Sequence, residues 1–146
     1  MNTLNKFQAR AVFVLRVVLG WLFLYAGITK VLNPAWSAAG FLQGAKTFHG
    51  FYAFLAHPML IGIVNILNEW GLVLLGAALI LGIWVRISAP LGALLMILYY
   101  FASNSLPLVP NGFLIDEHIV YAAVLVVLFY LNAGRYYGID GLRAGK

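Results

Sequence analysis

Long apolar runs alternate along the chain with short polar or proline-containing breaks. The runs cover residues 11–32, 59–85, 88–106 and 113–133. An α-helix needs about 20 predominantly apolar residues to cross the hydrocarbon core of a membrane, and each run is close to or above that length. The pattern therefore predicts an all-α membrane protein, a four-transmembrane-helix bundle in which residues 1–146 form a single domain.

The segment between the first two runs has a helical rather than a continuous apolar pattern. Within residues 35–55, polar side chains separate apolar ones that recur at helical spacing, at Phe41, Leu42, Ala45, Phe48, Phe51, Tyr52 and Leu55. This spacing predicts an amphipathic helix that lies in the membrane interface. Such a helix either packs on the end of the bundle or covers a pocket among the helices.

The composition excludes several classes of protein. Hydrophobic residues make up 64% of the chain and charged residues 9%, which leaves too few charges to cover a water-facing surface. Because there is no cysteine, disulfides, iron–sulfur clusters and thiolate zinc sites are excluded, and any redox chemistry needs a separate cofactor. The three histidines show no i, i+4 pair, so we expect no metal site.

The positive charges predict an orientation in the membrane, and we expect no nucleic-acid partner for them. Two lysines, Lys30 and Lys46, fall on one side of the predicted membrane. Six cations fall on the other side: Lys6, Arg10, Arg86, Arg135, Arg143 and Lys146. Since loops rich in lysine and arginine stay in the cytoplasm, both termini are expected there.

Two ionisable residues interrupt the apolar runs at depth. Glu69 lies about 15 Å below the outer start of its helix, and Arg16 lies about 9 Å deeper. Their side chains are long enough to span that gap, so we predict an Arg16–Glu69 ion pair within the bundle. The pair either fixes the helix register or serves a ligand, through a proton-exchanging carboxylate or a polar grip on a headgroup.

A second polar cluster is expected near the outer ends of the last two predicted helices. Asn104 ends one helix, and Asp116, Glu117 and His118 begin the next. The dipole of a helix explains acidic residues at its start but does not explain a histidine. Histidine titrates near neutral pH and can exchange a proton with a quinol oxygen.

Short motifs follow one another along most of the chain and together resemble the DoxX/DoxD family over residues 15–142. The motifs are Arg16–Gly20 with Gly27 and Lys30, residues 33–42, Asn68–Gly71 with Gly76, Gly82 and Arg86, Asp116–His118, and Gly134–Gly138. The resemblance implies a four-helix protein of a prokaryotic plasma membrane. Members of the DoxD branch are subunits of thiosulfate:quinone oxidoreductase, which oxidises thiosulfate to tetrathionate and passes the electrons to quinone.

The leading hypothesis is accordingly a quinone-linked subunit, such as that of a thiosulfate dehydrogenase, with membrane lipid, quinone and a DoxA-like second subunit as partners. Self-association of the chain is left open. The predicted site has catalytic residues that exchange protons (Glu69, Glu117 and His118), residues that hold the quinone (Arg16, Trp70, Tyr100 and Asn104) and lysines that attract the anionic sulfur substrate (Lys30 and Lys46).

Two other classes of protein remain open at this point. A non-enzymatic scaffold or chaperone-like protein would bind partner helices or lipids, and it would have a packed interior without a ligand-sized cavity. A small transporter is disfavoured because the sequence shows neither a mid-membrane helix break nor an inverted repeat.

Overall fold

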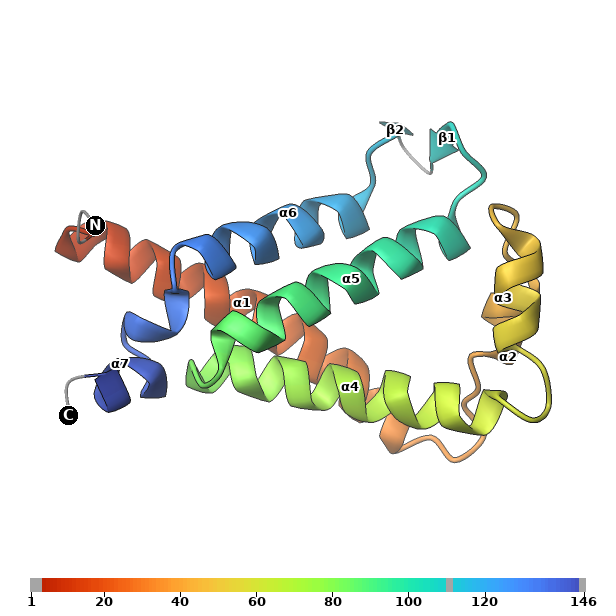
Figure 1. Cartoon of the computed structure of the whole chain (residues 1–146), viewed down its shortest axis with the longest axis horizontal. Helices are drawn as coiled ribbons and strands as arrows, with labels where there is room; N and C mark the ends of the chain where they lie inside the picture. The colour runs from red at the N-terminus through yellow and green to blue at the C-terminus, as the bar shows by residue number, and fades with distance from the viewer. Residues whose placement is uncertain (1–3, 110–111, 145–146) are drawn as a thin grey trace.

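The computed structural model describes residues 4–109 and 112–144, and its elements are almost entirely helical (Figure 1). Its longer helices are α1 (Lys6–Val31), α4 (Ile61–Leu81), α5 (Val85–Ser103) and α6 (Glu117–Tyr130). The shorter elements are α2 (Ala39–Gln43), α3 (His49–Leu55), the antiparallel strands β1 (Leu108–Val109) and β2 (Gly112–Phe113), the 3-10 helix η1 (Ala133–Arg135) and α7 (Ile139–Ala144). The all-α prediction is confirmed.

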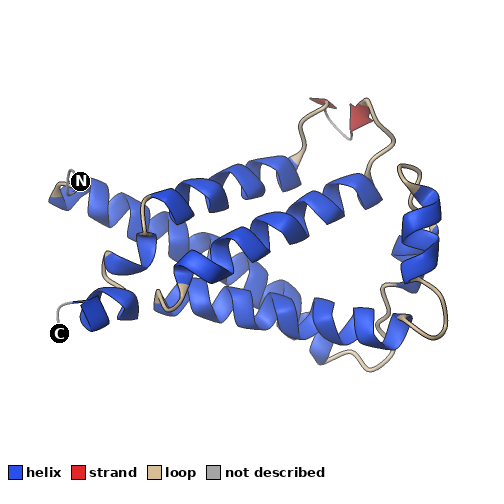
Figure 2. Ribbon diagram, viewed as in Figure 1, coloured by secondary structure: helices blue, strands red, loops and turns tan. Residues whose placement is uncertain are grey.

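The long helices form two packed pairs. Helix α1 packs along α4, and α5 packs along α6. Helices α4 and α5 meet at a short connection near both termini and diverge toward the other end of the molecule (Figures 1 and 2). Helices α2 and α3 lie across this wider end, and their small apolar cluster includes Ala102 of α5. The molecule therefore has a closed end, which holds the termini, and a wide end.

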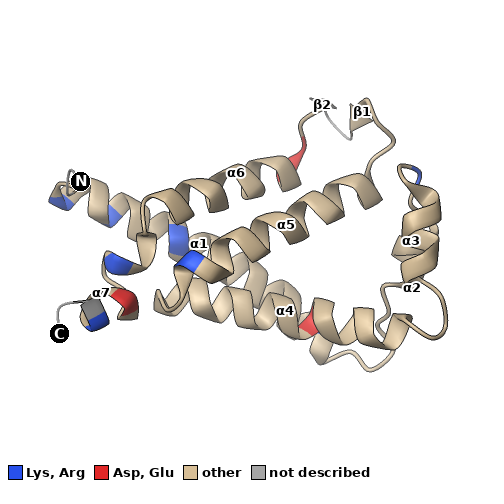
Figure 3. Ribbon diagram, in the orientation of Figure 1, with Lys and Arg blue, Asp and Glu red and all other residues tan. Residues whose placement is uncertain are grey.

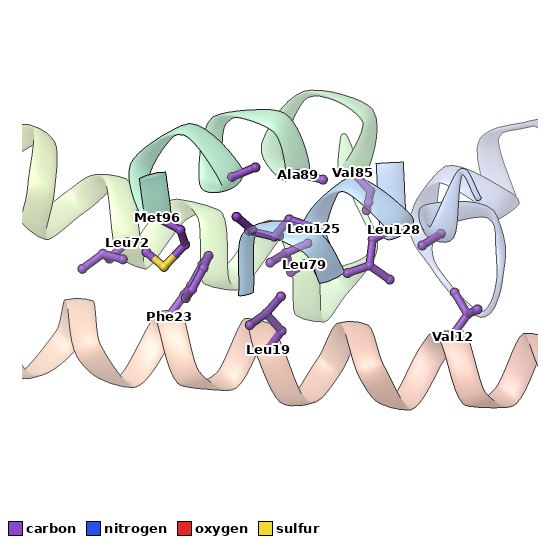
Figure 4. Packing of buried hydrophobic residues seen from close by; sticks show 13 residues of the cluster. Val12, Leu19, Phe23, Leu72, Leu79, Val85, Ala89, Met96, Leu125 and Leu128 are labelled. Atoms are coloured by element: carbon purple, nitrogen blue, oxygen red, sulfur yellow. The ribbon is translucent and has the colours of Figure 1, made fainter. Parts of the chain in front are cut away.

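The main core joins both pairs. Its fully buried members include Phe23 of α1, Leu79 of α4, Val85 of α5 and Leu125 of α6. In Figure 4, Phe23 points away from α1 toward Met96. Because all four helices contribute to one cluster, the two pairs are expected to fold as one unit.

The outward faces of the helices are apolar rather than polar. Large side chains that point away from the core are between 60% and 65% exposed, among them Val18, Trp21, Ile66 and Leu74. Across the candidate spans, α1, α4 and α5, only 33%, 17% and 44% of the most apolar stretch is buried inside the protein. A surface of this kind is typical of a protein surrounded by lipid.

The number of membrane spans is the first difference from the sequence prediction. Among the described residues, three helices are long and apolar enough to cross a membrane: α1, α4 and α5. Helix α6 has 14 residues, which correspond to about 21 Å at the helical rise, less than the roughly 30 Å of a hydrocarbon core. The chain has the helices of a multi-pass membrane protein, but the count of four spans is not confirmed.

Local contacts explain why the helix ends differ from the apolar runs. The run over 113–133 becomes the shorter α6 because Phe113 pairs with Leu108 and because Asp116 accepts the first helical N–H groups. The run over 88–106 becomes a helix that already begins at Val85. Its first N–H groups are bound by a carboxylate from α7, that of Asp140, which accepts from Val85 at 3.1 Å.

The predicted amphipathic helix over residues 35–55 is present as two short helices. Helix α2 ends at Gln43, and α3 begins after Phe48, whose φ of 52° lies in the left-handed region. The second helix is fixed to the bundle because the Tyr52 hydroxyl donates to the Leu98 carbonyl oxygen at 2.7 Å. The amphipathic pattern thus predicted the packing of Leu42, Ala45, Tyr52 and Leu55 but neither the break nor the exposure of Phe41, Phe48 and Phe51.

Glycines allow α1 and α4 to approach each other closely. A Cβ atom at Gly76 would lie 2.7 Å from the Gly20 carbonyl oxygen and closer still to the Leu24 nitrogen. A Cβ atom at Gly27 would lie 2.6 Å from the Val73 nitrogen. Small residues at helix contacts are a common means of association inside membranes, where apolar burial between helices gains little.

A buried arginine connects α1 to the C-terminal segment. Arg16 is 0% exposed, and its Nη1 donates to the carbonyl oxygens of Ala133 at 2.8 Å and Tyr136 at 3.3 Å. Its Nη2 donates to the Tyr137 carbonyl oxygen at 3.2 Å. The charge of Asp140 also acts on this guanidinium group. The predicted Arg16–Glu69 ion pair is therefore wrong, because backbone carbonyls at the closed end bind the arginine.

Lysine and arginine positions cluster at the end that holds both termini, as Figure 3 shows. Lys46 belongs to the segment between α2 and α3, the two helices of the wide end. This distribution agrees with the asymmetry of the sequence, and the cytoplasmic location of the termini stays a prediction. Lys146 lies outside the described residues.

We expect Gly76→Ala to lower the free energy of unfolding by about 1–3 kcal/mol, because the added methyl group would meet the α1 backbone. Gly71→Ala on the same helix is the control, since a Cβ there has nothing within 4 Å. The measurement is thermal or denaturant unfolding in detergent micelles. Equal stability of the two variants would contradict the close α1–α4 approach.

We expect Arg16→Met to cost about 3 kcal/mol or more, because it removes the buried positive charge that Asp140 acts on and the side-chain donors to three carbonyl oxygens, those of Ala133, Tyr136 and Tyr137. Trypsin should also cleave faster after Arg135, which lies in the released segment. Arg10→Met, at an exposed position on the same helix, should change neither readout. Resistance to trypsin equal to that of the unsubstituted protein would show that the arginine does not retain the C-terminal segment.

Candidate functional site

A pocket of about 300 Å³ lies among the long helices and the segment before α2. It is lined by polar and aromatic side chains: Lys30, Trp36, Ser37, Phe41, Asn68, Tyr99, Ser103 and His118, together with Ala38. All four long helices contribute to this wall, and the contribution of α6 is His118 in its first turn. The pocket is the strongest candidate for a functional site because it combines concavity with convergent polar groups.

Two further cavities share walls with this pocket. One, of about 240 Å³, shares Lys30, Tyr99 and His118 and adds the acidic residue Glu117. The other, of about 230 Å³, shares Asn68 and Tyr99 and is otherwise mostly apolar, with leucines from α2 to α5: Leu42, Leu55, Leu67, Leu95 and Leu98. Tyr99 is thus common to all three cavities, and a polar chamber adjoins an apolar slot.

His118 is held by an acidic partner at the start of α6. Its Nδ1 lies 2.7 Å from Oδ2 of Asp116, whose side chain is only 7% exposed. The same oxygen accepts from Nδ2 of Asn104 at 2.7 Å, and Asn104 is itself 2% exposed. The carboxylate fixes the orientation of the imidazole through Nδ1, so Nε2 is the ring nitrogen that this contact does not use.

The pKa of Asp116 lies below its usual value. Burial acts to raise this pKa, but hydrogen bonds from Asn104, His118 and the Ile119 N–H together outweigh it. A lowered pKa keeps the carboxylate ionised at neutral pH, so Asp116 is suited to stabilise a positive charge on His118.

Lys30, near the end of α1, lines both the pocket and the adjoining cavity. Its Nζ donates to the Ala26 carbonyl oxygen at 3.1 Å and lies 5.5 Å from the centre of the Trp36 ring. The charge of Glu69 acts on this ammonium group. Glu69 therefore acts on Lys30 through space, without a direct ion pair among the described residues, and the lysine brings a positive charge to the wall of the pocket.

Asn68 and Tyr99 form the third polar part of the wall. Nδ2 of Asn68 lies 2.6 Å from the Tyr99 hydroxyl, to which it donates, and the Tyr99 ring meets the His118 ring edge-on with centroids 5.8 Å apart. Oδ1 of Asn68 is buried and has no hydrogen-bond partner in the protein. This acceptor lies at the wall of two adjoining cavities, where it can accept a hydrogen bond from a bound molecule.

The structure brings some of the predicted site residues together. Lys30, Glu117 and His118 line the pocket or the cavity that adjoins it. Asn104 lies behind His118 and acts through Asp116 rather than on a ligand. Glu69 is linked to the site by its charge on Lys30.

Other predicted site residues lie elsewhere. Tyr100 is 6% exposed and its hydroxyl donates to the Leu114 carbonyl oxygen, so it supports the loop before α6. Trp70 is 50% exposed on the outward face of α4. Lys46 is exposed between α2 and α3, and Arg16 belongs to the closed end. None of these four lines the pocket.

Sequence reasoning missed Asn68, Tyr99 and Trp36 as members of the site. Asn68 and Tyr99 each precede a predicted residue by one position, and a shift of one position rotates a side chain by about 100° around a helix. The adjacent Tyr99–Tyr100 and Asn68–Glu69 pairs carried a signal for a polar site. They did not show which member of each pair faces inward.

The helices and the pocket define a multi-pass membrane protein with a polar, ligand-sized chamber between its helix pairs. The sequence model of the DoxX family matches residues 11–105, and the chain belongs to this family. No curated protein and no solved structure matches the chain. The resemblance over residues 15–142 is thus confirmed as membership over the matched part.

We expect Asp116→Asn to lower the free energy of unfolding by about 1.5–3 kcal/mol at neutral pH, because hydrogen bonds to a charged acceptor are lost. The folded-state pKa is lowered, so this stabilisation is complete above the unfolded value of about 4 and is lost as the pH falls through the folded value. The measurement is unfolding as a function of pH. Glu117→Gln, at the exposed neighbouring position, is the control. If the difference in unfolding free energy between Asp116→Asn and the unsubstituted protein persists unchanged into strong acid, the stabilising role of the Asp116 carboxylate is contradicted.

Proposed function

We propose that this chain binds a membrane quinone or quinol in the pocket between its helix pairs and serves as the quinone-linked subunit of an oxidoreductase. The observation that carries the proposal is the polar chamber that adjoins an apolar slot, with His118 at the wall of the chamber and Asp116 bound to it from behind. A quinone has the same two parts, a polar ring and an apolar tail.

The residues of the pocket fit such a ligand. The aromatic side chains Trp36 and Phe41 can contact a flat ring, while Lys30 and His118 offer donors to its oxygens. The orphaned Oδ1 of Asn68 is an acceptor for a quinol hydroxyl. The leucine-lined slot gives an apolar tail a path that avoids polar groups.

The side chains can also perform the proton chemistry of such a site. His118 Nε2 can take or give a proton because Nδ1 is bound to Asp116, which stabilises the charged imidazole. Lys30 stabilises a negative oxygen at the wall of the pocket. A bound quinone would accept two electrons and two protons and become a quinol. Glu117 lines the adjoining cavity and provides a second acid for proton exchange.

The electron donor we propose is thiosulfate, which yields tetrathionate when oxidised, and a DoxA-like subunit would work beside this chain. This part of the proposal is supported by the resemblance to the DoxD branch. It is also supported by Lys30 and Lys46, two cations near the wide end that would attract a dianion.

The test is quenching of tryptophan fluorescence by decylubiquinone, with the full chain in phosphatidylcholine nanodiscs. We expect saturable quenching that is lost in Trp36→Phe, because Trp36 lines the pocket. His118→Ala and Asn68→Leu should each weaken binding by roughly tenfold, the effect of one lost hydrogen bond in a buried site.

His57→Ala is the matched control, since His57 is exposed between α3 and α4. Equal affinity of the His118 and His57 variants would contradict the assigned pocket. Absence of saturable quenching would contradict quinone binding and favour the scaffold alternative. Thiosulfate-dependent quinone reduction by membranes containing the chain, with and without a DoxA-like subunit, tests the electron donor separately.

A further inference from the structure

We propose that the closed end of the molecule carries a second binding site, which takes the phosphate headgroup of an anionic phospholipid. A recess of about 380 Å³ lies there between the start of α5, η1 and α7. Three arginines line it, one from each of these elements: Arg86, Arg135 and Arg143. The recess shares no residue with the quinone pocket, so this proposal is independent of the proposed function.

The arginines that line the recess outnumber its one carboxylate three to one. Asp140 also lines the recess, but its two oxygens accept from the backbone nitrogens of Trp84 at 2.9 Å and Val85 at 3.1 Å. Within residues 4–109 and 112–144, no carboxylate oxygen lies within 4 Å of a side-chain nitrogen of these three arginines. The recess therefore holds a concentrated positive charge that favours an anion.

Arginine is the side chain that suits a phosphate group. Its planar guanidinium group presents parallel N–H donors that match two phosphate oxygens at once. Three such groups around one recess can surround a phosphate on several sides. Arg86 also lies 5.8 Å from the centre of the Phe129 ring, a contact that positions its guanidinium group at the surface of the bundle.

The surroundings of the recess favour a lipid over a free phosphate ion. Ile87 lines the recess and is 61% exposed, and it begins an outward stripe on α5 that continues with Leu91 and Leu94, which are 53% and 57% exposed. These residues recur at i, i+4 and i+7, so they share one face of the helix. An acyl chain can lie along the stripe while the phosphate binds the arginines.

The aromatic residue beside the arginines fits the same orientation. Trp84 lines the recess and is 62% exposed, and exposed tryptophans of membrane proteins lie at the level of the headgroups. Basic pockets between helices are known recognition sites for anionic headgroups. A lipid bound here would contact α5, η1 and α7 together and would stabilise the C-terminal segment that Arg16 holds.

The test measures lipid retained by the purified full chain in detergent, by native mass spectrometry, with phosphatidylglycerol and phosphatidylcholine as probes. We expect preferential retention of phosphatidylglycerol and a higher thermal midpoint in its presence. Replacement of Arg86, Arg135 and Arg143 by glutamine should weaken retention by on the order of tenfold per arginine. The control replaces Lys6, Arg10 and Lys46 by glutamine, which removes the same charge from exposed positions and should leave retention within about twofold.

Each other outcome decides against the proposal. Equal retention of the two lipids, or an equal loss in both triple variants, would show that the recess does not recognise the headgroup. If inorganic phosphate without lipid raises the thermal midpoint as much as phosphatidylglycerol does, the site takes a free anion. If the triple variant does not fold, Arg143→Gln alone, at an exposed position of α7, must still reduce retention by about tenfold.

Discussion

The backbone carbonyls of Ala133, Tyr136 and Tyr137 converge on the guanidinium group of Arg16, and this contact fixes one end of the molecule. An arginine inside an apolar bundle is stable only where donors and acceptors match, so the C-terminal segment must fold back to supply acceptors. Asp140 follows in that segment and binds the first N–H groups of α5. One buried charge therefore determines where the C-terminus lies and where α5 begins.

The closed end and the wide end are consequences of the same packing. Glycines let α1 and α4 touch along their length, while Val85, Ala89 and Leu125 bury the contact of α5 with α6 near the closed end. Because α4 and α5 diverge from there, the space between the pairs grows toward α2 and α3 (Figure 1). Side chains with polar ends, such as Asn68 and Tyr99, occupy that space, and the cavities remain between them.

The sequence predicted the helices well and their partners less well. Apolar runs depend on the residues themselves, so α1, α4 and α5 could be located from the pattern alone. The start of α5 depends on Asp140, which lies 55 residues away from Val85, and no local pattern shows such a contact. Likewise Arg16 binds carbonyl oxygens, which every residue has, so its partners could not be recognised from residue types.

The candidate site illustrates the same limit at the level of single positions. The sequence showed that His118 needs an explanation beyond the helix dipole, and the structure supplies Asp116 and Asn104 as its support. Which of two adjacent tyrosines faces the chamber depends on the rotation of α5, and that rotation is fixed by tertiary packing. The Tyr100 hydroxyl donates to the Leu114 carbonyl oxygen of the loop before α6, and Tyr99 lines the chamber.

The distribution of carboxylates explains why the two ends suit different ligands. At the closed end the single carboxylate of Asp140, held by backbone N–H groups, offsets only part of the charge of three arginines, and an anion is favoured there. At the wide end Asp116 is bound to His118 and the charge of Glu69 acts on Lys30. His118 and Lys30 thus each have an acid nearby, so the chamber is closer to balance in charge, which suits the neutral quinone ring proposed for it. A net positive recess and a polar chamber closer to charge balance occupy opposite ends of one apolar bundle.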